Sequence, residues 1–389
     1  MTAIPAASAA SAGRAPARWI FSPAIDLAVF GAPAMVALAL VLAAPALGLA
    51  GADTPDWAWI TGVLLVDVAH VWSTGFITYL DRSELARRPV LYATVPLAGW
   101  LVGVVVYALA GPAGFWRALA YLAIFHFVRQ QYGWLALYRA RAGERSGALI
   151  DGAMIYAATL YPLVWWHTAS PRAFAWFVEG DLATGWPSAI ATGAGALYLA
   201  IIAVYVVRAV VTARRGPVPW GKHLVVATTA ACWYAGIVAT DGDFTFTVTN
   251  VLIHGVPYVA LVVLYGRAVA AADPASAAAP GPRLLRRPVL LAVSLLWLVA
   301  FVEELLWDRA VWHDHGHLFG GSLALDDLHV VLVPLLAVPQ LSHYVLDGFL
   351  WRRGHNPRLA LWFRGRLGGC PGSSVSSAAA GPASRPTST

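Results

Sequence analysis

The chain has 389 residues, of which 59% are hydrophobic and only 12% are charged, and its mean hydropathy is +0.66. Soluble domains carry roughly twice that share of charged residues, so the composition excludes an ordinary soluble domain. The net charge of +6 comes from basic loops rather than from a nucleic-acid-binding surface, and no nucleic-acid partner is expected. Cys232 and Cys370 are the only cysteines, which excludes a disulfide framework and a thiolate metal site.

Apolar segments long enough to cross a bilayer recur along the whole chain. We expect ten of them, at residues 24–50, 57–80, 90–110, 115–138, 148–168, 187–211, 222–240, 243–266, 284–306 and 327–350. No soluble domain has room to fold between them. The sequence therefore predicts an all-α, polytopic integral membrane protein with one transmembrane domain over residues 21–352. Residues 1–20 and 353–389 are expected to be cytoplasmic and largely disordered.

The loops between these segments differ in charge on the two sides of the membrane. If the N-terminus is cytoplasmic, most of the 26 Lys and Arg residues fall in cytoplasmic segments, as the positive-inside rule requires. The acidic residues Glu303, Glu304 and Asp308 then fall on the outer side. An even number of spans with both termini in the cytoplasm follows. We expect a multi-pass protein of the bacterial cytoplasmic (inner) membrane, with the lipid bilayer as its surroundings.

Ionisable and amide side chains inside the predicted spans concentrate in four of them. In chain order these side chains are Asp67 and His70, then His126, Arg129 and Gln130, then Asn250 and His254, and finally His343 and Asp347. All four spans run from the outer side to the cytoplasm in the predicted topology. A charged side chain at the bilayer centre costs about 3 kcal/mol or more, so intramembrane polar residues indicate function by default.

The depths of the four histidines are similar. His70, His126 and His254 stand 12 or 13 residues before the basic residue that ends their span, which is roughly 18–20 Å along a helix. His343 stands nine residues before Arg352, roughly 13 Å, and is expected nearer the cytoplasm. We expect the four histidines to converge on a metal ion.

Each histidine has a polar residue three or four positions away on the same helical face. Asp67 and Asp347 are expected to orient the ligands or to join them, since a metal-bound histidine usually donates its second N–H to such a group. Arg129 is expected to pair with Asp67 or Asp347, either as a structural ion pair or as part of the site. For Asn250 we favour a simple contact between helices.

For two further groups of residues, a structural or incidental role is preferred over a functional one. Aromatic side chains such as Tyr132, Tyr258 and Tyr344 could line a substrate pocket, but ordinary packing is the preferred interpretation in aromatic-rich spans. The outer loop between the last two spans carries His313, His315 and His317, and His329 follows it. His-rich tracts bind metals, yet histidines in a loop of free geometry favour a weak, adventitious site.

The leading hypothesis is an oxidoreductase with non-haem iron held by the four histidines. Imidazole suits iron, zinc, copper and nickel, and histidine–carboxylate sites with open positions are typical of non-haem iron oxygenases. In a bilayer the substrate is a lipophilic small molecule such as an isoprenoid, a carotenoid or an acyl chain. Arg129 or Gln130 would hydrogen-bond an oxygen intermediate or a substrate head group.

A multi-span chain with single histidines on several helices, with "FHF" at 125–127 and "HG" at 254–255, resembles the Brp/Blh-type membrane β-carotene dioxygenases. The resemblance implies histidine-bound non-haem iron and cleavage of a carotenoid to retinal. The chain departs from that family's Pro-His-Gly…Asp arrangement, because Ile253 precedes His254 and no Asp follows within the next turns.

Two other functions use the same residues. A proton-coupled transporter would employ the intramembrane His, Asp and Arg side chains as a relay, and Pro257 would break the helix beside His254. Haem could be carried by two of the histidines, for example His70 and His254. The sequence has no C-x-x-C-H motif, which excludes a c-type haem.

Overall fold

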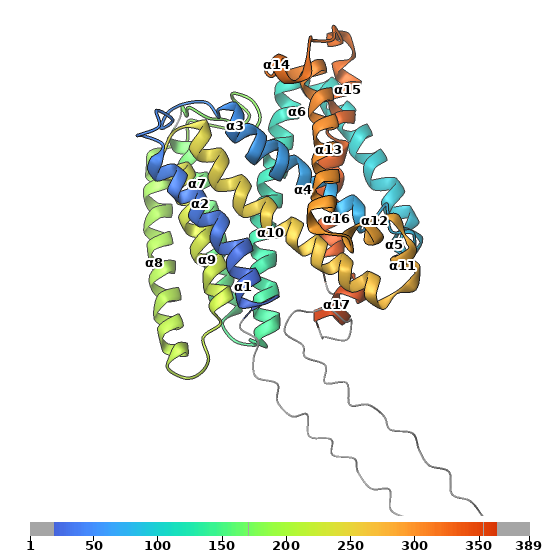
Figure 1. Cartoon of the computed structure of the whole chain (residues 1–389). Coiled ribbons are helices and arrows are strands. Elements are labelled where there is room, and N and C mark those ends of the chain that lie inside the picture. Colours follow the sequence, from blue (N-terminus) through green and yellow to red (C-terminus); the bar gives the residue numbers. More distant parts are fainter. Residues whose placement is uncertain (1–18, 170, 353, 364–389) are drawn as a thin grey trace, which may run out of the picture.

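The computed structural model describes residues 19–169, 171–352 and 354–363. All elements in these residues are helical, as expected for an all-α protein, and none of them is a strand. Eight helical segments are long and apolar enough to cross a membrane, which is consistent with a membrane protein. They form one bundle (Figure 1). Most of the predicted disordered ends lie outside the described residues.

The first half of the chain supplies five of the eight segments. Its elements are α1 (Pro23–Asp26), η1 (Leu27–Gly31), α2 (Ala32–Ala43), α3 (Asp56–Ala58), η2 (Trp59–Val68), α4 (Ala69–Phe76), α5 (Arg82–Arg87), α6 (Pro89–Ala142), α7 (Ala148–Thr168) and α8 (Ser188–Ala213). The second half supplies α9 (Trp220–Trp233), η3 (Tyr234–Ala239), α10 (Asp243–Ala272), α11 (Pro274–Ala278), α12 (Pro280–Leu285), α13 (Val289–Trp307), η4 (Asp308–Trp312), α14 (Gly316–Phe319), η5 (Asp326–Leu328), α15 (His329–Leu336), α16 (Val338–Leu350) and α17 (Pro357–Phe363).

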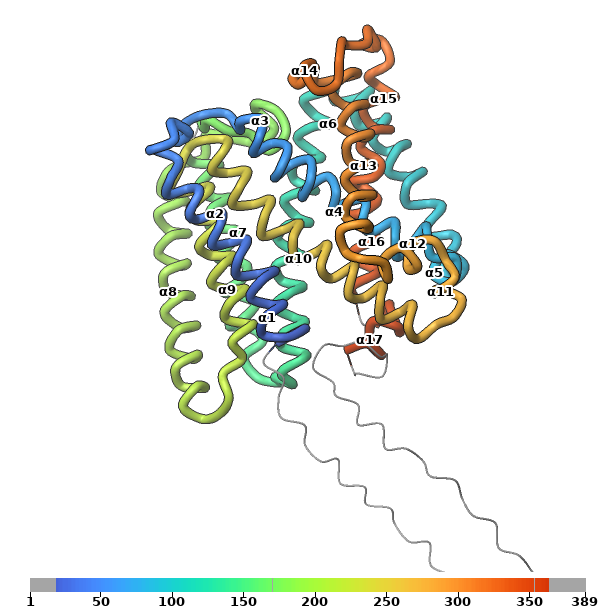
Figure 2. Tube along the Cα trace, in the orientation of Figure 1, coloured from blue at the N-terminus to red at the C-terminus, as the bar shows by residue number. Residues whose placement is uncertain are grey.

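The 54 residues of α6 are two helices joined at Gly111. Gly111 has φ 68°, a left-handed conformation that favours glycine, and Pro112 follows it. The ring of Phe115 lies 3.3 Å from the Cβ position of Gly103, whereas twelve residues of straight helix span about 18 Å. The chain therefore turns back, as the trace in Figure 2 shows. Thus α6 accommodates both predicted spans 90–110 and 115–138.

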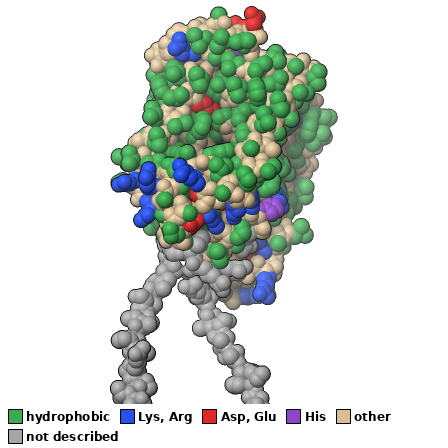
Figure 3. Space-filling model, turned by 90° about the vertical axis from the view of Figure 1, so that its right-hand side faces the viewer, with side chains coloured by type: hydrophobic (Ala, Val, Ile, Leu, Met, Phe, Trp, Pro, Cys, Tyr) green, Lys and Arg blue, Asp and Glu red, His purple; other side chains and the backbone are tan. Residues whose placement is uncertain are grey.

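The predicted span 222–240 corresponds to α9 and η3, which are not among the eight membrane-length segments. The number of membrane crossings stays a prediction, and so does the location of both termini in the cytoplasm. Lys and Arg side chains gather in the lower part of the face in Figure 3, below a mostly hydrophobic surface. This charge distribution has the form that the positive-inside rule describes.

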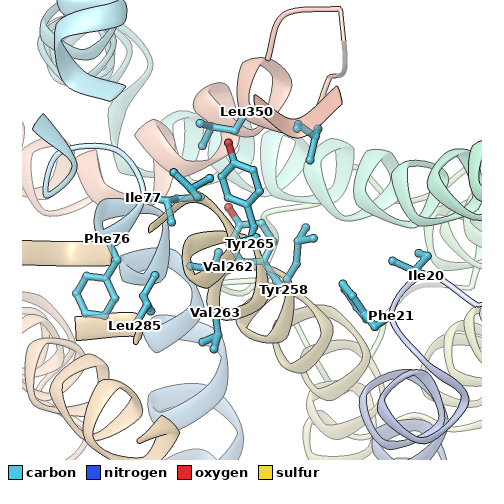
Figure 4. Packing of buried hydrophobic residues seen from close by; sticks show 14 of the residues in the cluster. Ile20, Phe21, Phe76, Ile77, Tyr258, Val262, Val263, Tyr265, Leu285 and Leu350 are labelled. Carbon is cyan, nitrogen blue, oxygen red and sulfur yellow. The ribbon is translucent and has the colours of Figure 1, made fainter. Parts of the chain in front are cut away.

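Helix α10 is the most enclosed of the eight segments. Of its apolar window 72% is buried, against 6–44% for the others, and it crosses the bundle diagonally in Figure 1. Figure 4 shows Tyr258, Val262 and Tyr265 of α10 packed among side chains of neighbouring elements. The polar residues of α10 are thereby carried into the interior rather than towards lipid.

The predicted tail 353–389 begins with residues that contact the bundle. Arg358, in α17, places its guanidinium 2.8 Å from Asp273 and 3.3 Å from Asp81. Trp362 of the same helix is buried against the core. Residues from 364 onward lie outside the described part of the chain.

An ion network joins α6, α7, α8 and α9 around Asp151, which is completely buried. Arg139 contacts its carboxylate, Arg208 lies at 2.9 Å and Lys222 at 3.3 Å. Glu144 also pairs with Arg139 and Lys222, so Asp151→Asn leaves Arg208 as the cation without a carboxylate partner among the described residues. We therefore expect the variant to lower the free energy of unfolding by about 3–5 kcal/mol. Denaturant unfolding of the detergent-purified protein measures the change. Asp327→Asn, on an exposed residue, should change stability by less than about 0.5 kcal/mol; equal losses in both variants would contradict the prediction.

Candidate metal centre

Four histidines from four helices meet inside the bundle, and each offers one ligand atom within 4.8 Å of the others. They are His70 on α4, His126 on α6, His254 on α10 and His343 on α16. Their exposed fractions are 1%, 5%, 0% and 1%. Four nitrogens about 2.1 Å from one ion in a tetrahedron are about 3.4 Å apart, so small side-chain adjustments suffice to hold an ion.

The predicted convergence of the four histidines is confirmed, and their burial and spacing allow them to bind a metal ion. His343 does not lie in a layer nearer the cytoplasm, as its spacing from Arg352 predicted, but in the same group as the others. The reason is that helices such as α10 are inclined in the bundle (Figure 1), so distance along a helix does not measure depth.

Two of the four imidazoles lack ordinary hydrogen-bond partners among the described residues. Among the described residues, neither nitrogen of His70 nor of His254 makes a hydrogen bond. By contrast, the buried His167 uses both nitrogens, at 2.8 Å from Tyr121 Oη and 2.6 Å from the Leu163 carbonyl. Since buried polar atoms are nearly always paired, the unpaired imidazoles fit the donor set of a metal ion.

A chain of hydroxyl groups fixes the tautomer of His343. Tyr258 Oη donates to Asp347 Oδ1 at 2.5 Å, and Thr74 Oγ1 lies 2.8 Å from both Tyr258 Oη and His343 Nδ1. Because Tyr258 gives its one proton to the carboxylate, Thr74 must donate to Tyr258 and accept from His343 Nδ1–H. The lone pair of His343 Nε2 then points to His126 Nε2, 3.2 Å away, which is the tautomer that binds a metal.

A second polar layer lies one helical turn from the histidines. Each of the four has a polar residue four positions later, on the same face of its helix: Thr74, Gln130, Tyr258 and Asp347. Three of these form the hydroxyl chain, and Gln130 Nε2 donates to the carbonyl oxygen of His254 at 2.9 Å. Only two of the four, Gln130 and Asp347, were predicted as site residues. The repeated spacing of four would have identified Thr74 and Tyr258 as well.

On the other side of the histidine layer, Asp67 and Asn250 differ in their contacts. Asp67 lies in the π-helix η2, and its Oδ1 is 3.5 Å from His70 Nδ1, longer than a hydrogen bond. π-Helical turns are frequent at functional sites. Asn250 Nδ2 donates to the Phe246 carbonyl of its own helix at 2.9 Å. Asp67 is therefore the carboxylate beside the site, and Asn250 bonds within α10.

The structure places Arg129 away from the histidines. Its exposed guanidinium donates to Tyr156 of α7 and lies 5.0 Å from the ring centre of Tyr132. Among the described residues no carboxylate is within ion-pair distance of it, so the expected pairing with Asp67 or Asp347 is not formed. Side chains three residues apart point about 60° apart on a helix, and the bond to Tyr156 holds Arg129 towards α7.

The outer-loop histidines do not form a second closed group with the ligand geometry of the buried four, as far as the described residues show. His317 Nε2 lies 3.0 Å from Asp56, and His315 Nδ1 lies 3.7 Å from Asp308. His313 adopts a left-handed conformation with φ 63°. His329 does not join them but bonds the Ala310 carbonyl at 2.8 Å.

Gly255 allows α10 to approach η2 closely. A Cβ at this position would lie 2.7 Å from Val66 Cγ1 and 3.0 Å from the Val66 carbonyl oxygen. This approach brings the ring centres of His254 and His70 within 4.6 Å of each other.

We expect Gly255→Ala to separate the two helices and to lower the metal content by at least about tenfold, as measured by elemental analysis. Gly133→Ala, where a Cβ meets open space, should leave the metal content unchanged; unchanged content in both would refute the role of Gly255.

Comparison with protein-family models, with curated proteins and with solved structures finds no match to this chain. The fold and the histidine group define the class of protein: an all-helical protein with membrane-length apolar helices and a buried site that can bind a metal ion.

Proposed function

We propose that this chain is a membrane-embedded metal oxidoreductase in which the four histidines hold a single redox-active ion, with iron as the first candidate. The observation that carries the proposal is the convergence of four buried imidazoles, two of which make no hydrogen bond within the described part of the chain. Imidazole is a good ligand for iron, and a bound iron would supply activation of dioxygen. The protein itself supplies the ligand geometry, the tautomer of His343 and a water-poor interior.

The arrangement favours a single ion over haem. Two histidines that bind haem must face each other across a macrocycle, with free space around the line between them. The ring of His126 lies 5.1 Å from that of His254, and the ring of His343 lies 4.8 Å from that of His70. These rings stand where the macrocycle would extend.

The surroundings of the site favour a lipophilic substrate, such as an isoprenoid, a carotenoid or an acyl chain. Phe127 stacks on His254 with ring centres 3.6 Å apart, and Tyr344 stacks on His126 at 4.6 Å. These aromatic faces exclude water from the imidazoles. Gln130 Oε1 is buried without a partner among the described residues, and it would accept a hydrogen bond from a substrate hydroxyl. Carotenoid cleavage, the activity of the Brp/Blh-type family, is the first reaction to test.

The alternative, a proton-coupled transporter, has less support. Transporters commonly break a helix near the middle of the membrane. Here α10 continues without interruption from Asp243 to Ala272, although Pro257 lies inside it, so the predicted break beside His254 is wrong.

The test begins with elemental analysis and an optical spectrum of the detergent-purified protein. We expect about one iron per chain, no Soret band, and dioxygen consumption that depends on an added carotenoid or isoprenoid. A Soret band would indicate haem instead. A colourless, metal-free protein would refute the proposal and make proton-coupled transport the next function to test.

A further inference from the structure

An open groove of about 280 Å³ lies between the end of α6 and the start of α7. Its lining includes the apolar side chains of Leu135, Ala136 and Ala148 and the charged side chains of Arg139, Glu144 and Arg145. None of these residues is a member of the histidine group, so the groove is a second candidate site. Ligand pockets typically measure roughly 300–1,000 Å³, and the groove therefore has room for a small polar group rather than for a large ligand.

The connection between α6 and α7 forms the rim of the groove and is held by arginine side chains. Gly147 has φ 73°, a left-handed conformation that favours glycine, and a Cβ there would collide with the Arg208 guanidinium. Arg139 and Arg208 both donate to the carbonyl oxygen of Ser146, at 2.9 and 3.1 Å. The backbone of the rim is thus fixed, whereas the side chain of Arg145 within it is exposed.

Positive charge exceeds negative charge around the groove. The two carboxylates of Glu144 and Asp151 stand among four cations: Arg139, Arg145, Arg208 and Lys222. Arg139 and Lys222 each contact both carboxylates, so the negative charges are already neutralised within the protein. Arg145 makes no hydrogen bond or ion pair within the described part of the chain. The groove therefore offers a free guanidinium to an anion.

The lining matches a phospholipid in both of its chemical parts. Guanidinium groups bind phosphate through charge-assisted hydrogen bonds. Leu149, which follows Ala148, is 85% exposed, so apolar surface continues outward from the groove. Basic pockets between membrane helices on the cytoplasmic side recognise anionic head groups, and the predicted topology places the α6–α7 connection on that side.

We propose that the groove between α6 and α7 binds the head group of an anionic phospholipid. Arg145 contacts the phosphate, and Leu135, Ala136 and Ala148 contact the beginning of the acyl chains, which extend past Leu149. The inference goes beyond the proposed function and does not depend on it, because no metal ligand takes part.

The experiment titrates the detergent-purified full-length protein with phosphatidylglycerol and counts bound lipids by native mass spectrometry. Phosphatidylcholine with the same acyl chains is the zwitterionic comparison, and the wild type should bind it more weakly. Removal of one basic residue near an anionic lipid surface lowers binding by about fivefold. We therefore expect Arg145→Gln to lower the affinity for phosphatidylglycerol about fivefold and to leave that for phosphatidylcholine unchanged.

The controls separate charge, shape and the source of the phosphate. Arg286→Gln, on an exposed arginine at the end of α12, should keep the wild-type affinities. Ala148→Leu narrows the groove without changing its charge and should weaken the binding of both lipids by the same factor. Excess glycerol 3-phosphate, which carries the phosphate without the chains, should not displace phosphatidylglycerol.

Three results would overturn the proposal. The first is a wild type that binds neither lipid or binds both equally. The second is an Arg145→Gln variant that keeps the wild-type preference for phosphatidylglycerol. The third is displacement of the lipid by glycerol 3-phosphate, which would assign the groove to a soluble phosphate instead of a membrane lipid.

Discussion

Replacing any one of the four histidines with glutamine should remove most of the metal from the purified protein, whereas the wild type should hold about one ion per chain. Residues that only support metal ligands account for 10- to 100-fold in affinity, so loss of a ligand should cost more than about 100-fold. The effect should be largest for His254, which is 0% exposed and whose ring nitrogens make no hydrogen bond among the described residues.

Elemental analysis after dialysis measures this loss, and thermal unfolding provides a second readout. A ligand present at 1000 times its Kd stabilises the folded state by about 4 kcal/mol, so a chelator should lower the Tm of the wild type but not that of the variants. His167→Gln is the matched control, because His167 is also buried in the bundle but pairs both nitrogens with protein groups. It should keep its metal. Wild-type metal content in the His254 variant would refute the site.

Tyr258→Phe and Thr74→Val should each weaken metal binding by about 10- to 100-fold without removing a ligand. Tyr258→Phe deletes the hydroxyl that links the Asp347 carboxylate to Thr74 by hydrogen bonds. Thr74→Val deletes the acceptor of His343 Nδ1–H. In both variants His343 can protonate Nε2 instead, and its lone pair then points away from the site. Competition with a chelator of known affinity gives the change in Kd.

The controls for the hydroxyl chain are specific. Thr74→Ser keeps the hydroxyl and should restore most of the affinity. Tyr265→Phe removes a similarly buried phenol from the same helix, one that bonds Asn356 rather than Asp347, and it should leave the Kd unchanged. If Tyr258→Phe and Tyr265→Phe behave alike, the hydroxyl chain does not fix the tautomer.

Much of the fold was predictable because apolar length alone identifies helices that can cross a bilayer. Each of the ten predicted spans overlaps a helix of the structure. The turn at Gly111 was also foreseen, as the boundary between two spans. The inclination of α10 was not, because tilt depends on packing against neighbouring helices rather than on the sequence of one helix.

Part of the site was predictable from the sequence because ionisable side chains stand out in an apolar helix. The four histidines stood out for this reason, whereas Thr74 and Tyr258 did not, because hydroxyl groups are ordinary in such helices. Arg129 was equally conspicuous, but sequence position gives its height on α6 and not the direction of its side chain. That direction depends on which helices pack on either side, and α7 receives it through Tyr156.

The four histidines are spread along most of the chain, from His70 to His343. During synthesis, α4, α6 and α10 leave the ribosome well before α16 does, so a growing chain holds at most three of the histidines. The complete group of four histidines can therefore form only after α16 has joined the bundle. Until then the other three histidines lack the fourth member of the group. Placement of α16 thus completes the histidine group, and α17 packs on the bundle after it.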